Sequence, residues 1–345
     1  MKLLITGAAG FIGSHLVETL LAQGHQVIGI DNFLDYYPRW MKEKNLEGVR
    51  NQRGFEFIEA DLLETDLVGL VKRLEGVIHL AAQAGVRASW GENFRTYSDN
   101  NILATQRLLE ACRGEGIKKF IYASSSSLYG DTDDLPMREE SILRPVSPYG
   151  VSKAAGEYLA YLYYRNFGLP TVSLRFFTVY GPRQRPDMAF HRFFKAGIEG
   201  KPLVVWGDGE QSRDFTFIDD IVQGCRRALE AGRDGSVYNI GGGSRRTLNE
   251  ILEAMRRITG KPLEVNYQPV QKGDVRHTGA SLEKIKKELG YNPQVSMMEG
   301  LEREWEWVRE LYHINETNDI NQRNHNRRNH GHQQGITGNS GLPEV

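Results

Sequence analysis

Short apolar runs alternate along the first half of the chain with longer stretches that carry apolar residues at helical spacing. The nearly all-apolar runs predict strands buried on both faces, and they lie at 2–6, 26–30, 55–60, 76–82, 119–124 and 171–177. The helical stretches between them lie at 14–23, 65–74, 100–113 and 152–168. This alternation predicts an α/β protein built on a doubly wound parallel sheet.

The pattern changes after residue 178, where glycine, proline and arginine become frequent and helical periodicity persists only at 219–231, 247–259 and 299–312. We therefore predict a first domain at 1–178 and a smaller domain, mainly 179–312, over the carboxyl edge of the sheet. Some later segments are expected to return to the first domain. The tail at 313–345 is rich in Asn, His, Arg, Gln and Gly, a composition typical of disorder.

Composition narrows the function classes without choosing one. The 345 residues carry a formal net charge of -1, which gives no indication of a nucleic acid or a membrane surface as partner. Two cysteines provide neither a disulfide framework nor metal-ligand spacing, so no metal site is expected. No apolar run is long enough to span a bilayer and no signal peptide is evident, which predicts a cytoplasmic protein.

A glycine-rich loop joins the first strand to the first helix. Its glycines permit a tight turn and a close approach of backbone N–H groups to a pyrophosphate; they are Gly7, Gly10 and Gly13. The second strand ends in Asp31, 18 residues after Gly13, where a carboxylate would accept hydrogen bonds from an adenosine ribose and repel a 2′-phosphate. Asn32 follows rather than an arginine. The combination predicts a Rossmann-type dinucleotide site that favours NAD over NADP.

Further cofactor candidates follow from their places at strand ends. Phe11 and Ile12 belong to the glycine-rich loop. Asp61, with Leu62 beside it, ends the third strand and could accept from an adenine amino group; an ordinary helix N-cap is the less favoured alternative. Small or apolar residues that leave room for a cofactor end the fourth strand: Leu80, Ala81 and Ala82.

Tyr149 and Lys153 stand four residues apart at the start of a predicted helix, so they share one face. An ammonium beside a phenol stabilises the phenolate and is expected to lower its pKa from about 10 toward neutrality. The phenolate could then remove a proton from a substrate hydroxyl during hydride transfer. The spacing is common by chance, and it gains weight from its place after the fifth strand and a loop of hydroxyl side chains.

The chain resembles the extended short-chain dehydrogenase/reductases, specifically the NAD-dependent sugar-nucleotide epimerase/dehydratase family, over roughly 1–312. The motifs that carry the resemblance, in order, are TGAAGFIG, DN at 31–32, DL at 61–62, HLAA, YSDNN, SSSSLYG, YGVSK, RFFTVYGPRQRP, GDGEQSRDF and GDVRHT. The resemblance implies a bound NAD, a C-terminal domain for a nucleotide sugar such as a UDP-sugar, and a homodimer.

The resemblance assigns the family's functional roles to residues at the matching motif positions of this chain. The resemblance implies that Tyr149 is the acid/base, that Lys153 holds both Tyr149 and the nicotinamide ribose, and that Ser125 is the catalytic hydroxyl. Asn100 matches a cofactor-side asparagine. Two arginines match residues that grip the nucleotide diphosphate, with a surface ion pair as the alternative for each: Arg213 and Arg276.

The reaction is inferred from Ser126 and Ser127, which replace the acids that related dehydratases and decarboxylases place after the catalytic hydroxyl. Without such an acid, the simplest chemistry is oxidation at the sugar C4 and return of the hydride to the other face. The segments 81–87 and 175–190 resemble UDP-glucuronate 4-epimerases. The alternatives are a 4-epimerase of UDP-glucose or UDP-N-acetylglucosamine, a decarboxylase or dehydratase, and a non-catalytic NAD-sensing protein.

A 4-keto glucuronate is a β-keto acid that loses CO2 when its C5–C6 bond aligns with the carbonyl. We hypothesise that hydrogen bonds from Ser126, Ser127 and Thr178 hold the carboxylate out of this alignment; packing at a strand end is the less favoured alternative for Thr178. Arg185 is expected nearby as a charged partner or gate, and Arg87 is a further candidate beside the sugar.

Overall fold

The computed structural model describes residues 1–312 and is built around one seven-stranded sheet whose strands are all parallel. Its strand order is β3-β2-β1-β4-β5-β6-β10. The strands are β1 (Lys2–Thr6), β2 (Gln26–Asp31), β3 (Phe55–Glu59), β4 (Gly76–His79), β5 (Lys119–Ser125), β6 (Thr171–Phe176) and β10 (Ser236–Ile240). The predicted doubly wound parallel sheet is confirmed.

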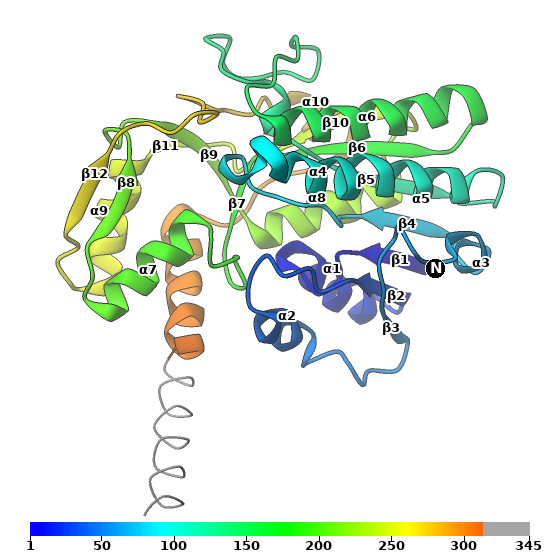
Figure 1. The fold of residues 1–345 in the computed structure, drawn as a ribbon, viewed down its shortest axis with the longest axis horizontal. Coiled ribbons are helices and arrows are strands. Elements are labelled where there is room, and N and C mark those ends of the chain that lie inside the picture. The colour runs from blue at the N-terminus through cyan, green and yellow to red at the C-terminus, as the bar shows by residue number, and fades with distance from the viewer. Residues whose placement is uncertain (313–345) are drawn as a thin grey trace, which may run out of the picture.

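Helices cover both faces of this sheet, which explains why its strands are apolar at successive positions (Figure 1). In β1, Leu3 and Ile5 pack in one buried cluster with α1 (Phe11–Ala22) and α8 (Ile218–Ala231). Leu4 between them belongs to the cluster on the other face, and that cluster includes the helices α3 (Leu67–Val71), α5 (Ala104–Cys112) and α6 (Pro148–Phe167). Alternate side chains therefore enter opposite cores.

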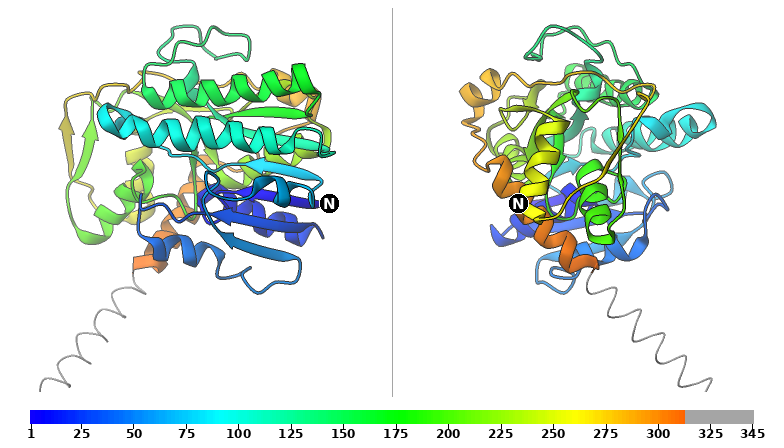
Figure 2. Two further views of the ribbon diagram at one scale, coloured as in Figure 1. Left: turned by 45° about the vertical axis from the view of Figure 1, so that its right-hand side comes forward. Right: turned by 90° about the vertical axis from the view of Figure 1, so that its left-hand side faces the viewer.

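A smaller region lies beyond the carboxyl ends of the large sheet, at the left of Figure 1. It contains a three-stranded sheet, a two-stranded parallel sheet and two helices. These elements are β7 (Thr178–Tyr180), β9 (Ser212–Phe217) and β11 (Arg245–Thr247), then β8 (Leu203–Trp206) and β12 (Val265–Gln268), with α7 (Ala189–Glu199) and α9 (Leu248–Thr259). Figure 2 shows the same separation after rotation.

Later segments return to the large sheet. After β9 the chain enters α8, which packs against α1, and then β10 pairs with β6 at the sheet edge. α10 (Glu283–Leu289) packs against β10, and a last helix occupies 297–312. The remaining short elements are α2 (Arg39–Leu46), α4 (Phe94–Tyr97), the 3₁₀ turns η1 (Arg87–Ser89), η2 (Gly91–Asn93) and η4 (Ser126–Leu128), and a π-helical segment η3 (Ser98–Leu103).

Within residues 1–312, no helix combines the length and the apolar character needed to cross a membrane. The expectation of disorder at 313–345 concerns residues outside the described part of the chain.

Candidate active site

One cleft runs along the carboxyl ends of β1, β2, β4 and β5, the edge at which open α/β sheets bind ligands. Its volume is about 1230 Å³, including the part open to solvent. Every residue predicted to contact the cofactor lines this cleft: Gly7, Gly10, Phe11, Ile12, Gly13, Asp31, Asn32, Asp61, Leu62, Leu80, Ala81, Ala82, Asn100, Tyr149 and Lys153. Residues from 7 to 153 are thus brought together by the parallel strand order.

The glycine-rich loop has the geometry that its sequence requires. Gly7 adopts a φ of 69°, and a Cβ atom there would lie 2.9 Å from the backbone nitrogen of Ala81. At Gly13, a Cβ would lie 2.1 Å from the carbonyl oxygen of Gly7. Gly10 is the N-cap of α1 and offers no capping side chain, so the first N–H groups of this helix are available to an anion at the cleft. These features fit a dinucleotide pyrophosphate.

The end of the cleft that is expected to hold adenosine is organised around Asp31. Its carboxylate accepts hydrogen bonds from the N–H groups of Ala9, at 3.2 Å, and Phe33, at 2.9 Å. Its Oδ1 also lies 3.1 Å from the ammonium of Lys42, which is buried and lines the cleft. Nearby, Asn32 donates to Asp61 at 2.8 Å. Lys42 is not identifiable from the sequence, because nothing in its local pattern shows that α2 folds back onto Asp31.

Tyr149 and Lys153 stand in the first turns of α6, as predicted. Ser147 caps this helix by accepting from the N–H of Gly150 at 3.1 Å, and Pro148 occupies its first position, where a missing N–H costs nothing. Tyr149 is half-buried and meets the ring of Tyr97 edge-on, with centroids 6.2 Å apart. The Lys153 ammonium lies 4.5 Å from the ring centroid of Tyr122.

The pKa values of the pair differ from the sequence expectation. Burial lowers the pKa of Lys153 to about 7, against a smaller opposing effect of Glu157. Burial also raises the pKa of Tyr149, while the Ser125 hydroxyl and the Arg185 guanidinium act in the opposite direction. The expected lowering of the tyrosine pKa is therefore absent from the protein alone, because taking the phenolate out of water outweighs the opposing effects of Ser125 and Arg185.

Ser125 is the last residue of β5, and its Oγ accepts from the N–H of Ser127 at 3.1 Å. The chain then tightens into η4, and Ser126 and Ser127 do not line either of the two main clefts of the described structure. Asn100, on the π-helical segment, lines the cofactor cleft and donates to the carbonyl of Thr96 at 2.9 Å.

A second cleft opens in the smaller region. The predicted substrate residues that line it are Arg87, Thr178, Arg213 and Arg276. Arg185 instead lines the cofactor cleft, where it pairs with Asp187 at 2.9 Å. It thus lines a different cleft from Thr178, while its charge acts on Tyr149 and its guanidinium carbon lies 5.7 Å from the ring centroid of Tyr36.

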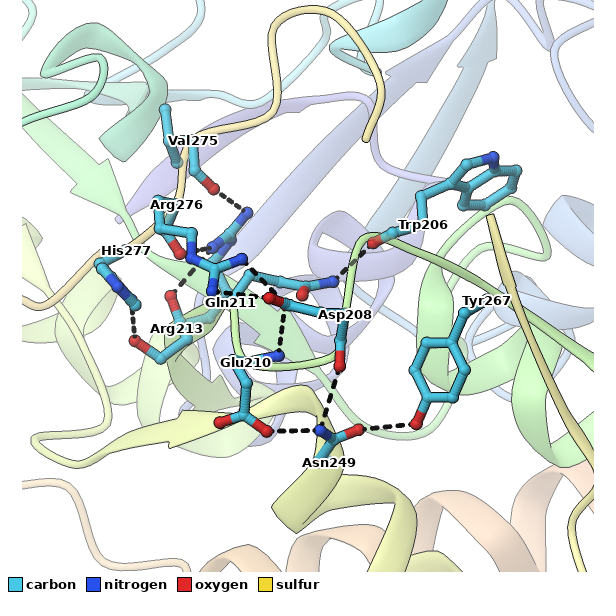
Figure 3. Close-up of polar contacts among 11 residues, drawn as sticks. Trp206, Asp208, Glu210, Gln211, Arg213, Asn249, Tyr267, Val275, Arg276 and His277 are labelled. Atoms are coloured by element: carbon cyan, nitrogen blue, oxygen red, sulfur yellow. Dashed lines mark hydrogen bonds and ion pairs between the residues drawn. The ribbon is translucent and has the colours of Figure 1, made fainter. Parts of the chain in front are cut away.

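The arginines of the second cleft are held by neighbouring protein groups (Figure 3). Arg276 makes a two-pronged ion pair with the Asp208 carboxylate, with N–O distances of 2.8 and 2.9 Å, which holds the pKa of Asp208 at about 2. Arg213 donates to the carbonyl oxygens of Val275 at 2.7 Å and Arg276 at 3.1 Å. The Asp208 carboxylate thus orients the Arg276 guanidinium at the cleft, and the two backbone carbonyl groups orient that of Arg213.

An aromatic surface in this cleft went unrecognised in the sequence. Trp206 lies beneath two guanidinium groups, with 4.1 Å from its ring centroid to Arg87 and 4.6 Å to Arg192. Arg87 also pairs with Asp274 at 2.7 Å. The tryptophan directly precedes the GDG motif, but only the tertiary structure brings it to residues 87 and 192.

Comparisons with known proteins agree with this geometry. Residues 3–241 match the model of the NAD dependent epimerase/dehydratase family. A relative from Bacillus subtilis, named uncharacterized UDP-glucose epimerase YtcB, is 46% identical over 314 residues, which is 90% of this chain and 99% of the relative. The UDP-glucuronate 4-epimerase of Thermodesulfobacterium geofontis is 40% identical, over 89% of this chain and 96% of its own length.

Among solved structures, the UDP-glucuronic acid 4-epimerase of Bacillus cereus in complex with UDP-glucuronic acid and NAD superposes with a TM-score of 0.89 at 46% identity. The superposition covers 90% of this chain and all of the other. The fold, the motifs and the matched length lead to one conclusion: the chain belongs to the NAD-dependent epimerase/dehydratase family.

Proposed function

We propose that the protein is an NAD-dependent UDP-glucuronate 4-epimerase, which forms UDP-galacturonate through a transient 4-keto sugar without decarboxylation. The observation that carries the proposal is the placement of Tyr149 and Lys153 in the wall of the cofactor cleft, with Ser125 beside Tyr149. Hydroxyl side chains occupy the two positions after Ser125, so the acid used by related lyases is missing from its usual place.

The residues have separate tasks in this reaction. Tyr149 takes the proton of the sugar 4-hydroxyl and later returns one, and Ser125 orients that hydroxyl by hydrogen bonding. Lys153 stabilises the phenolate form of Tyr149. NAD held in the first cleft would supply the acceptor for the C4 hydride and its later return, so no cofactor would be consumed.

The two clefts divide the ligands between them. The cofactor residues named above would hold NAD, with the pyrophosphate at the start of α1 and Asp31 at the adenosine ribose. In the second cleft, Arg213 and Arg276 are suited to two phosphates. To bind a phosphate, Arg276 must break its ion pair with Asp208. The guanidinium therefore exchanges one anionic partner for another.

The direct test is to incubate the purified protein separately with UDP-glucuronate, UDP-glucose and UDP-N-acetylglucosamine, without added NAD, and to identify the products by NMR. UDP-galacturonate as the main product supports the proposal. UDP-galactose would instead support the function in the name of the Bacillus subtilis relative. UDP-xylose or its 4-keto precursor would show a decarboxylase, and no turnover would favour an NAD-sensing protein.

Thr178 is proposed to keep the substrate carboxylate out of alignment with the 4-keto group. It begins β7, pairs with Phe215 of β9 and lines the second cleft. Thr178→Ala is therefore expected to release a UDP-pentose by-product at a rate above that of the wild type, detected by NMR during epimerisation. Thr178→Ser, which keeps the hydroxyl, serves as the control. Normal epimerisation with no pentose from Thr178→Ala would contradict this role.

We also propose that the protein is a homodimer joined through α6. One side of this helix carries exposed apolar residues: Val151, Tyr158, Tyr161 and Leu162. Contiguous exposed apolar surface of this kind is typical of interfaces. The double variant Tyr158→Glu/Leu162→Glu is expected to be monomeric by size-exclusion chromatography with light scattering. Val68→Glu, at an exposed apolar residue of α3, should leave the mass unchanged. A monomeric wild type would refute the interface.

The two proposed functional units are not contiguous in the sequence. We propose that 1–178 together with α8 and β10 forms the NAD-binding unit, and that most of 179–312 binds the nucleotide sugar. The cytoplasmic location belongs to the same proposal, and the two buried free thiols of Cys112 and Cys225 are consistent with a reducing compartment.

A further inference from the structure

A buried ion pair lies directly behind the catalytic residues. Glu157 on α6 and Arg175 on β6 are each 4% exposed. The guanidinium donates twice to the carboxylate, from Nη2 to Oε1 at 2.6 Å and from Nε to Oε2 at 3.0 Å. Burying two charges costs free energy, which is recovered only when the hydrogen-bond geometry between them is good. We therefore asked what role this pair has beside the active site.

The pair connects the elements that carry the active site. The Ser124 hydroxyl donates to Glu157 Oε2 at 2.6 Å, which ties the carboxylate to the end of β5, one residue before Ser125. Arg175 Nη1 donates to the Tyr129 hydroxyl at 2.7 Å, and that hydroxyl donates to Asn239 of β10 at 2.7 Å. Both ends of the serine-rich segment, 124 and 129, are therefore anchored to one ion pair.

Glu157 also acts on the catalytic lysine. It follows Lys153 by four residues on α6, so the two share a face of the helix. Its negative charge opposes the effect of burial on the lysine. The other ionisable groups around the two residues are Tyr149 on α6, His79 on β4, Tyr122 on β5, and Arg175, Tyr129 and Glu139 around the carboxylate. His79 is held neutral, because burial lowers its pKa to about 3.

We propose that Glu157, clamped by Arg175, is a positioning residue for the catalytic pair: its charge keeps the Lys153 ammonium protonated, and its carboxylate fixes the end of β5 that presents Ser125. Arg175 offsets the cost of burying the Glu157 carboxylate through its two hydrogen bonds to it. The inference rests on the proposed roles of Tyr149 and Lys153, and it adds a group that touches neither the substrate nor the cofactor.

The first test measures the lysine without any turnover. In the cofactor-free protein labelled with ¹⁵N-lysine, the Nζ resonance of Lys153, assigned by its loss in Lys153→Met, is followed against pH. The wild-type pKa is expected near 7. Glu157→Gln should lower it by about one unit. An unchanged pKa overturns the proposal even if the protein proves to act on another sugar, because this readout does not depend on activity.

The second test uses the pH profile of kcat with UDP-glucuronate. Since the lysine must be charged, activity is lost as pH rises through its pKa, and Glu157→Gln should move this alkaline limb to lower pH with little change in KM. Ser124→Ala removes only the tie to β5 and should lower kcat several-fold with the limb in place. An unchanged kcat in Ser124→Ala would refute the positioning role.

Two further variants test whether the shift of the alkaline limb could arise from a disturbed fold instead of the lost charge. Glu110→Gln removes a charge on the neighbouring helix α5, where Glu110 accepts from the Tyr163 hydroxyl at 2.6 Å, and should leave the limb unmoved. Glu157→Gln/Arg175→Met removes both buried charges and should restore a stable fold while the limb stays shifted. A limb at the wild-type pH in this double variant would contradict the proposal.

Discussion

Replacing Tyr149 by phenylalanine is expected to lower kcat by about 10²- to 10⁴-fold, the range that a positioned acid or base contributes. The change removes one hydroxyl and keeps the ring, so the edge-on contact with Tyr97 and the packing of the first turn of α6 persist. KM and the amount of NAD released on denaturation should therefore change little. The measurement is initial-rate kinetics with UDP-glucuronate, followed by NMR.

The matched control is Tyr158→Phe, which removes a hydroxyl from an exposed tyrosine of the same helix and should leave kcat unchanged. A kcat for Tyr149→Phe within threefold of the wild type would show that another group moves the proton. A loss of NAD together with activity would show that the hydroxyl serves binding rather than chemistry.

Lys153→Met should abolish measurable epimerisation and at the same time stabilise the cofactor-free protein. The lysine is only 4% exposed, and its pKa falls from the ordinary value of 10.5 to about 7. Between these two pH values the unfolded chain binds a proton that the folded chain does not. The wild type therefore loses stability as pH falls from 10.5 to 7, and the loss is complete below 7.

Methionine carries no proton in either state, so this loss disappears. Each pKa unit is worth about 1.4 kcal/mol, so the gain at pH 7 amounts to a few kcal/mol and raises Tm by several degrees. The check is thermal unfolding of cofactor-free protein at several pH values, with Lys72→Met, at an exposed lysine after α3, as control. A lower Tm for Lys153→Met at pH 7 would contradict the account.

Much of the architecture and of the cofactor site was predictable because it depends on local pattern. Apolar runs identify strands that are covered on both faces, and the parallel order then forces Gly7, Asp31 and Tyr149 to one edge of the sheet. The tyrosine–lysine spacing needs only a helix, and Ser147 and Pro148 supply a clear start for it.

The parts that escaped prediction depend on contacts between distant segments. Lys42 reaches Asp31 because α2 packs back over the cleft, and Trp206 at the end of β8 meets Arg87 of the distant turn η1. The predicted direction of the Tyr149 pKa shift was wrong because burial, which no local motif reports, outweighs the hydrogen bond of Ser125 and the charge of Arg185. Ser126 and Ser127 turn away into η4, a change of backbone geometry that four consecutive serines do not signal.

The path of the chain between the large sheet and the smaller region limits which parts of the protein can be removed or exchanged. The chain crosses between them repeatedly: from β6 to β7, from β9 to α8, from β10 to β11 and from β12 to α10, after which the last helix packs again on α7. A chain ended at residue 178 would lose β10 and leave β6 as an open edge, ready to pair with other chains. The smaller region is therefore not one contiguous segment that could be exchanged as a unit, so altering the second cleft requires substitutions spread over several segments of the chain.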